Sequence, residues 1–475
     1  MRGPVAGAGG DGKRKTEGVI LNAKTLIGRP VPIRALRPGG WPELAASPRL
    51  AVAARQAKFA GKAGQLLLLQ GADGAVEQAL FGLGEDEQEG AMLFRGLAAR
   101  LPVGDYELES GAPGLDPDLV ALAWTLGAYR FDRFKGEGGA VPGRLTVADA
   151  QWDRVAVVAE ACALARDLIN APANHMGPDQ VEVAARSVAA ANGADIAVVR
   201  GLDLLTQNYP AIHAVGRAAD PARAPRMIEI SWGQGPLLAI VGKGVTFDTG
   251  GLDLKPSAGM RWMKKDMGGA AHALALGQMI MRRALPVRLV ILLPVVENAV
   301  AGDAMRPGDV LASRKGLTIE VGNTDAEGRL ILADALARAA ELDPVLTVDL
   351  ATLTGAARVA LGPDIVPYYT DDDALAGEID AAARRVRDPV WRMPLWSGYA
   401  GAIDSDIADL KNDADPWSQA GSMTAALFLK RFAPARSWVH FDIFAWNARA
   451  RPGWPQGAEA QAIRALFALI EARYR

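Results

Sequence analysis

The sequence has few cysteines and histidines, and each shortage excludes a kind of site. The single Cys162 cannot form an internal disulfide, and it cannot supply the two to four thiolates of a cysteine-based structural zinc site. A lone cysteine is typical of a protein of the reducing cytoplasm. The four histidines form no HExxH motif, which excludes a thermolysin-like zinc site. We expect His272 and His440, which lie in apolar sequence, to be packed residues rather than ligands.

Net charge and long apolar runs are also lacking. The 52 basic residues nearly balance the 54 acidic ones, so no strong field attracts nucleic acid or an anionic membrane. No run approaches the roughly 18 residues of a membrane span, and RLVILLPVV at 288–296 predicts a buried strand. Residues 1–16 lack the apolar core of a secretory signal. We therefore expect a cytoplasmic protein without membrane or nucleic-acid partners.

Length and pattern predict two α/β domains. We expect a flexible segment at 1–25, a smaller N-terminal α/β domain at 26–147 and a larger C-terminal catalytic domain at 148–475. Strands such as VRLVILL and VLTVDLA are apolar on both faces, which predicts a mostly parallel, mixed sheet flanked by helices. In the larger domain we expect strands at 226–231, 237–241, 287–293, 317–321, 346–350 and 439–443, and helices at 180–191, 268–283, 330–342, 421–432 and 458–474. In the smaller domain we expect strands at 66–69 and 106–108 and helices at 85–100 and 116–130.

The first charged loop is GKGVTFDTGGLDLKP at 242–256, which begins at the end of a predicted strand. Glycines beside Lys243 are typical of a phosphate loop, but that motif needs Ser or Thr after the lysine, and here Gly244 follows. Asp248 would also repel a phosphate. A turn-rich connection with solvated charges is the remaining alternative for this loop taken alone.

Two further loops carry acids at comparable places. MKKDMGGA places Asp266 just before a helix, where a lone acid would be an N-cap. NTDAEGRL follows the strand at 317–321, and in an extended backbone Asp325 and Glu327 project to the same side. Three such loops in one α/β domain predict a hard-cation site, in which carboxylates bridge two divalent ions about 3.5–4 Å apart.

These three motifs, in this order and with this spacing, resemble the leucyl aminopeptidase family of two-metal exopeptidases. The resemblance extends to ARDLINAPAN at 165–174, DLATLTG at 349–355 and SDIADLKN at 405–412, and it covers about 165–443. It implies a metal-dependent hydrolase that removes N-terminal amino acids from short peptides. It also implies two divalent ions per subunit, Mn or Zn, a bicarbonate ion, and a homohexamer.

The resemblance assigns five metal ligands. Asp248 and Glu327 would bridge both metals, Lys243 and Asp266 would complete the tighter site, and Asp325 would bind the more exchangeable ion. A lysine can ligate a metal only as the neutral amine, and two nearby dications would depress its pKa accordingly.

The resemblance also assigns two catalytic residues. Lys255 would polarise the scissile carbonyl, and a cation there stabilises the developing oxyanion. Arg329 would hold the bicarbonate that acts as general base. Because the helix macrodipole disfavours a cation at the start of the predicted helix, an anion bound there explains Arg329 better than a bare surface position does.

The pocket for the first side chain departs from the family pattern. The resemblance implies that Met263, Thr352, Gly355 and Phe444 contribute to it, and Phe444-Ala445-Trp446-Asn447 stands where the family generally has Ala-Gly. We expect Phe444 to narrow the pocket, so that leucine loses its advantage over smaller or more polar residues. The alternative is that Phe444 packs in the core.

Two other functions remain as alternatives. A DNA-binding architectural or regulatory protein of the same family would need a basic stripe, and the Lys-Arg-Lys at 13–15 is too short for one. A two-metal phosphoesterase would not use Lys243 and would usually contain histidine ligands. The tryptophans near the C-terminus exceed what one core is expected to bury, which favours an oligomer; they are Trp417, Trp438, Trp446 and Trp454.

Overall fold

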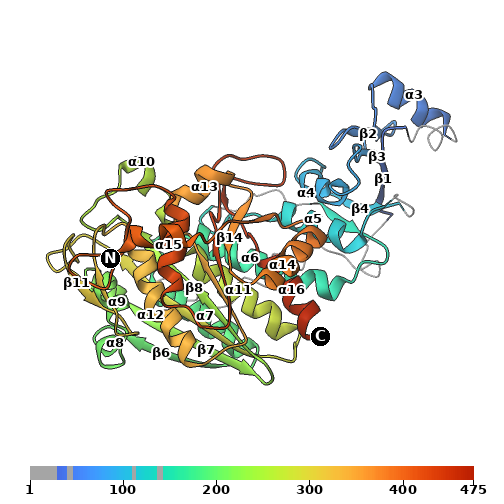
Figure 1. Ribbon diagram of the computed structural model, residues 1–475. Coiled ribbons are helices and arrows are strands. Elements are labelled where there is room, and N and C mark those ends of the chain that lie inside the picture. Colours follow the sequence, from blue (N-terminus) through green and yellow to red (C-terminus); the bar gives the residue numbers. More distant parts are fainter. Residues whose placement is uncertain (1–28, 40–46, 110–113, 136–142) are drawn as a thin grey trace, which may run out of the picture. The chain divides into compact units, whose positions relative to one another are not determined.

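The computed structural model describes residues 29–39, 47–109, 114–135 and 143–475, and the flexible segment predicted at 1–25 lies outside them. Contacts divide the chain into two compact units (Figure 1). The first contains the described residues up to Ala163 together with Asn447–Gln456, and the second contains Leu164–Trp446 and Gly457–Arg475. The limits predicted at 26–147 and 148–475 stay predictions, because a division by contacts does not test which segments fold independently.

The first unit is built on a five-stranded sheet. Its strands run in the order β2 (Leu66–Gln70), β3 (Val76–Gly82), β1 (Val31–Leu36), β4 (Asp105–Leu108) and β5 (Arg144–Thr146). β2 and β3 form an antiparallel hairpin, and the other neighbours are parallel. The helices are α3 (Pro48–Gln56), η2 (Gly90–Met92), α4 (Leu93–Ala98), α5 (Pro117–Ala128) and the first part of α6 (Trp152–Asn170).

The helix predicted at 85–100 forms only in part. Residues 85–89 are an exposed acidic turn, and helical structure starts at Gly90, where the side chains become buried. Phe94 of α4 packs edge-on against Phe81 of β3, with ring centroids 5.1 Å apart. Helix formation here follows burial against the sheet.

The second unit contains a nine-stranded mixed sheet, as predicted. Its strands run in the order β15 (Val390–Arg392), β14 (Val366–Tyr369), β17 (Ser437–Asp442), β13 (Leu346–Ala351), β8 (Leu237–Gly242), β10 (Arg288–Asn298), β7 (Arg226–Gly233) and β6 (Asp195–Arg200), and β9 (Gly244–Asp248) also pairs with β10. The central strands β17, β13, β8 and β10 are parallel, whereas β7, β6 and β14 run antiparallel to their inner neighbours. Shorter strands form two small sheets: β11 (Val310–Ala312), β12 (Thr318–Glu320) and β16 (Leu410–Lys411), and β18 (Trp446–Asn447) with β19 (Gly457–Ala458).

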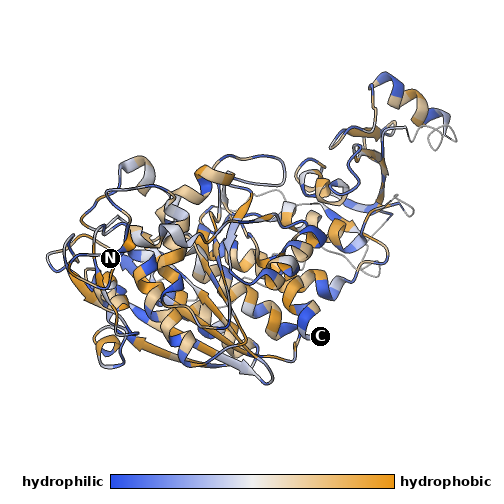
Figure 2. Cartoon of the chain, in the orientation of Figure 1, coloured by the Kyte–Doolittle hydropathy of each residue, from blue (hydrophilic) through white to orange (hydrophobic). Residues whose placement is uncertain are grey.

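Helices cover both faces of the large sheet. Val241, Val290 and Leu292 pack into a core cluster with α9 (Pro210–Gly216), α12 (Glu327–Glu341) and α15 (Gly421–Lys430). On the other face Ile291 contacts Gly277 of α11 (Gly268–Arg282). Burial on both sides explains the continuous apolar runs of these strands, which Figure 2 shows in orange. The remaining helices are α7 (Pro178–Ala191), α8 (Asp203–Thr206), η3 (Pro221–Arg223), α10 (Ser257–Met260), η4 (Met263–Met267), α13 (Gly355–Leu361), α14 (Asp373–Val386), η5 (Ser397–Ile403) and α16 (Ile463–Tyr474).

Two details differ from expectation. The last helix begins at Ile463 rather than at 458, because Gly457 and Ala458 pair in β19. Of the C-terminal tryptophans, Trp438 and Trp446 are buried, whereas Trp417 is 40% exposed. Across the residues that the structure describes, no helix has both the length and the apolar character needed to cross a membrane.

Candidate metal centre and active site

The charged loops follow the carboxyl ends of the central strands, where ligands bind in sheets of this kind. Lys243 occupies the one-residue break between β8 and β9. Its N–H donates to the carbonyl of Leu350 at the end of β13, and its carbonyl accepts from the N–H of Ala270 in α11. The backbone on both sides of Lys243 is therefore fixed by neighbouring elements.

Glycines make room for the charged side chains. A Cβ atom added at Gly328 would lie 2.3 Å from Cε of Lys243, so any larger residue directly after Glu327 would displace the Lys243 side chain. Gly250 and Gly251 have positive φ angles of 90° and 67°, a backbone conformation that glycine adopts without strain. The turn they form lets the Gly250 N–H donate to Oδ1 of Asp248.

Lys243 lies between two buried carboxylates. Its Nζ is 2.6 Å from Oδ2 of Asp266 and 3.0 Å from Oε1 of Glu327. Burial alone would lower the pKa of Lys243, but Asp266, Glu327 and Asp248 outweigh it and raise that pKa above its ordinary value. Without metal, this ammonium neutralises part of the acidic cluster.

A second lysine bridges the outer side of the same cluster. Nζ of Lys255 lies 2.8 Å from Oδ2 of Asp248 and also pairs with Asp325. Burial opposes the charge of Lys255, yet Asp248 and Glu327 raise its pKa overall. The structure thus brings all five predicted metal ligands and Lys255 together.

Three of the carboxylates converge closely enough to bind a cation. Ligand oxygens of Asp248, Asp325 and Glu327 lie within 4.8 Å of one another. Burial, and then the Asp248 carboxylate, raise the pKa of Glu327 to about 8 and that of Asp325 to about 6. Among the described residues, Oε2 of Glu327 is buried without a hydrogen-bond partner. Crowded, unsatisfied carboxylate oxygens are the ligands that hard divalent cations prefer, so this donor set fits the predicted metals.

The route to this convergence differs from the sequence-based expectation. An extended backbone was expected to carry Asp325 and Glu327, but Asp325 lies in a turn and Glu327 begins α12. Asn412, a residue to which the sequence assigned no role, fixes the loop: its Oδ1 accepts the N–H groups of Gly322 and Asn323. Its Nδ2 donates to the carbonyls of Asn323 and Ala326. The loop conformation therefore depends on a residue that is distant in sequence.

Other polar residues orient the carboxylates. Nδ2 of Asn298 donates to Oδ1 of Asp248 at 2.8 Å. The hydroxyl of Thr352, predicted to contact substrate, donates to Oδ1 of Asp266 at 2.9 Å. Asn298 ends the strand β10, and its position at a strand end was the one sequence signal that could have indicated this role.

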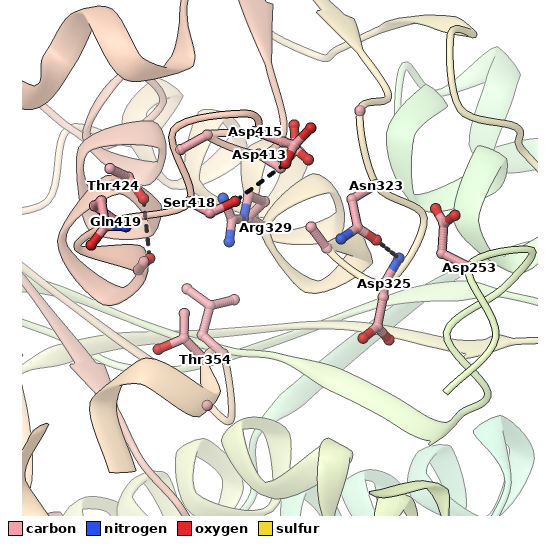
Figure 3. A pocket seen from close by; sticks show the side chains of 16 residues that line it. Asp253, Asn323, Asp325, Arg329, Thr354, Asp413, Asp415, Ser418, Gln419 and Thr424 are labelled. Carbon is pink, nitrogen blue, oxygen red and sulfur yellow. Dashed lines mark hydrogen bonds between the residues drawn. The ribbon is translucent and has the colours of Figure 1, made fainter. Parts of the chain in front are cut away.

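Arg329 faces a cavity of about 450 Å³ beside the carboxylates. Figure 3 shows Asp325 reaching this space from the loop before α12 and Arg329 reaching it from the first turn of α12, with Thr354 across from them. The arginine is 8% exposed, and no carboxylate of the described chain forms an ion pair with it. Burial lowers its pKa. The remaining lining residues are Asp253, Gly322, Asn323, Ala326, Leu353, Gly355, Asp413, Ala414, Asp415, Ser418, Gln419, Gly421 and Thr424.

The predicted pocket residues divide into two groups. Gly355 lines this cavity, whereas Met263, Thr352 and Phe444 lie outside its lining. Phe444 is half-buried, and its ring centroid is 5.0 Å from Nζ of Lys265. Burial lowers the pKa of Lys265 to about 8.

Two histidines are structural, as predicted. Nδ1 of His272 lies 2.7 Å from the carbonyl of Gly268, and its Nε2 accepts the N–H of Gln461. Burial lowers the pKa of His272 to about 4, so the ring is neutral. His440 is hydrogen-bonded to Asp349 inside the sheet.

Comparison with known proteins agrees with this geometry. A model of the catalytic domain of the cytosol aminopeptidase family matches residues 163–467, and a model of the M17 aminopeptidase N-terminal domain matches residues 31–143. The N-terminal match extends beyond the resemblance seen in the sequence, which began near residue 165.

Relatives and solved structures agree with this assignment. A probable cytosol aminopeptidase of Syntrophotalea carbinolica is 38% identical over 87% of this chain and 89% of its own length. A crystal structure of the cytosol aminopeptidase of Coxiella burnetii shares 41% identity and a TM-score of 0.89, and the match covers 96% of this chain and 99% of that one. The bottromycin maturation enzyme BotP in complex with Mn shares 34% identity and a TM-score of 0.84, over 94% of this chain and 100% of that one.

The fold, the converging acidic loops and these matches agree on one class of hydrolase. They confirm the predicted family, the mixed α/β fold and the predicted aminopeptidase activity. The names of these relatives give no support to the DNA-binding alternative. The chain belongs to the cytosol aminopeptidase family and is a metal-dependent aminopeptidase.

Proposed function

We propose that this aminopeptidase removes the first residue of short peptides with two divalent cations held by Lys243, Asp248, Asp266, Asp325 and Glu327. The convergence of the three carboxylates around an unsatisfied Glu327 oxygen carries the proposal. When bound, such cations polarise the peptide carbonyl and lower the pKa of a water molecule. The Mn complex of BotP supports manganese as one of the ions, and zinc is the other candidate.

Lys255 is proposed to stabilise negative charge on the carbonyl oxygen. Its Nζ contacts Asp248 and Asp325 at the edge of the cluster, and its side chain is 15% exposed. A raised pKa keeps the ammonium charged at neutral pH. A fixed cation at this position acts on the charge that develops during reaction.

Arg329 is proposed to hold a bicarbonate ion, which supplies a general base. The guanidinium is buried beside the cavity, and its Nε has no hydrogen-bond partner in the described chain. A small oxyanion satisfies such a group with paired, charge-assisted hydrogen bonds. The first turn of α12 adds amide groups that favour an anion at the same place.

We also propose a cytoplasmic homohexamer that admits short peptides. The names of the relatives support the location. The exposed side chains of Trp391, Trp396 and Trp417 support a contact between subunits. Sedimentation equilibrium that gives a 50.0 kDa monomer would contradict the assembly.

The test of the activity uses the full chain, stripped of metal and reloaded with Mn, Zn, Co or Mg. Aminoacyl anilides with a free amino group are compared with their N-acetylated forms. Hydrolysis that returns with metal and requires the free amino group is the expected result. Full activity in the stripped protein, or cleavage of the acetylated substrates, would contradict the proposal.

A further inference from the structure

Lys265 is a buried lysine without a carboxylate partner. It lies on η4 directly before Asp266 and is 7% exposed. In the described part of the chain, neither an ion pair nor a hydrogen bond reaches its Nζ. Burying an unpaired ammonium group costs free energy, so the presence of Lys265 at this position needs an explanation.

The carboxylates around Lys265 are already engaged. Asp266 pairs with Lys243 and accepts a hydrogen bond from Thr352. The carboxylate of Asp442 accepts four hydrogen bonds, at 2.6–3.1 Å, from Leu353, Thr354 and Ser422. Both acids attract Lys265 through space, but neither forms an ion pair or a hydrogen bond with its Nζ among the described residues.

A second unpaired cation lies at the same aromatic ring. Cζ of Arg358 is 5.2 Å from the ring centroid of Phe444, and Nζ of Lys265 is 5.0 Å from it. No carboxylate of the described residues pairs with the exposed Arg358. The ring faces the two cations with its electron-rich surface but cannot neutralise either charge.

Neither cation lines the cavity, but the helix that carries Arg358 reaches it. Arg358 stands one helical turn after Gly355 on α13, so both residues share a face of that helix. Gly355 lines the cavity, and a Cβ atom added there would meet nothing within 4 Å. The space directly beside Gly355 is therefore open, on the face of the helix that also carries Arg358.

We infer that the enzyme selects peptides whose first residue is acidic, glutamate or aspartate, with the side-chain carboxylate paired to Lys265 and Arg358. The inference rests on the proposed function and specifies its substrate class. An anion supplies the partner that both cations lack, whereas a leucine side chain leaves them unpaired. The planar fork of Arg358 suits a carboxylate, and Lys265 adds a charge that is already shielded from water.

The test compares glutamyl and glutaminyl anilides, which have nearly the same shape and differ in charge, on the Mn-loaded holoenzyme. We expect kcat/KM for the glutamyl substrate to be higher by roughly tenfold to a hundredfold, the range of one charge-assisted hydrogen bond. Lys265→Met should abolish this ratio and Lys265→Arg should retain it. Lys430→Met, which breaks an exposed ion pair with Asp371, is the matched control and should leave the ratio unchanged.

The outcomes separate this inference from the function on which it rests. If the wild-type enzyme cleaves leucyl and glutaminyl substrates at least as well as the glutamyl one, the acidic preference is wrong and the aminopeptidase function stands. A wild-type ratio that survives Lys265→Met also overturns the assignment. A protein that cleaves none of these substrates with any metal overturns the proposed function itself. If Lys265→Met fails to fold, the glutamyl-to-glutaminyl ratio of the wild-type enzyme and the effect of Arg358→Gln on that ratio still test the acidic preference.

Discussion

The two halves of the proposed active site balance charge in opposite ways. Around the predicted metals, Lys243 and Lys255 are surrounded by carboxylates, so the negative charge is in excess. Beside Phe444, Lys265 and Arg358 have no carboxylate partner in the described chain. The first half has an excess of acids for a cation to neutralise, and the second has cations for an anion to neutralise. A peptide with an acidic first residue offers that anion.

The largest effect is expected from a substitution that removes a carboxylate from the acidic half. Glu327→Ala deletes a ligand that is proposed to bridge both metals, so kcat/KM should fall by at least about a hundredfold, since loss of an outer-shell partner alone costs roughly 10–100-fold. Metal content, measured by mass spectrometry, should fall with it. Glu341→Ala, at the far end of the same helix, is the control. An active Glu327→Ala enzyme would show that the acidic half does not bind the catalytic metal.

The next test changes a cation in the acidic half. Lys255→Ala should keep its metal content and lose roughly 10²–10³-fold in kcat, with a smaller change in KM, because the ammonium acts on charge that develops during reaction. Steady-state kinetics and metal analysis of one preparation give both readouts. Loss of metal with turnover preserved would mean that Lys243 and Lys255 have exchanged roles.

A third charged cluster extends the comparison, because in it one buried carboxylate balances several cations. Glu182 is buried and accepts hydrogen bonds from Arg186, Arg200 and Arg226. Burial would raise the pKa of Glu182, but the three arginines lower it from 4.5 to about 2. Glu182→Gln should therefore cost on the order of 2–3 kcal/mol of stability at neutral pH.

The pH dependence of that cost has a definite sign. The folded protein binds the Glu182 proton more weakly than the unfolded chain, so the stabilisation is complete above pH 4.5 and is lost as the pH falls toward 2. Thermal midpoints of wild type and Glu182→Gln should converge over that range. Glu378→Gln, which breaks a half-exposed pair with Arg473, should shift stability little at any pH. A pH-independent difference would assign the effect to packing.

The smallest expected effect concerns Phe444, the aromatic ring that both cations contact. Phe444→Ala should raise kcat/KM for leucyl relative to alanyl anilide by about tenfold, because it widens the pocket by several methylene volumes. If Phe444 is instead a core residue, the ratio stays the same and folding loses about 3–5 kcal/mol. Paired kinetic and unfolding measurements separate the two.

The sequence predicted the elements whose signal is local. β8, β10 and β13 are apolar on both faces. The ends of β8 and β13 were predicted to within one residue, whereas β10 continues to Asn298, beyond the end predicted at 293. β9 was missed because it is short, glycine-bounded and follows β8 after a single residue. Its hydrogen bonds go to β10, whose sequence position gives no indication of this pairing.

The site was predictable where charge and glycine recur in fixed spacing. The residues that hold those loops were not, since Asn412 and Asp442 act on partners about 90 residues earlier. For the same reason the sequence predicted an extended backbone at Asp325 instead of a turn, because the hydrogen bonds that bend this loop come from Asn412. Likewise, the sequence does not show that Lys265 lacks a partner, which becomes evident from distances alone.

The four hydrogen bonds of Asn412 also bear on when a newly made chain becomes active. The ribosome releases Gly322, Asp325 and Glu327 well before Asn412, which follows Gly322 by 90 residues. In the same way, Thr354 is synthesised before its hydrogen-bond partner Asp442, which follows it by 88 residues. A nascent chain therefore has all the carboxylates of the acidic cluster before it has the residues that hold their loops in place, so the cluster can assemble only after Asn412 and Asp442 have been synthesised.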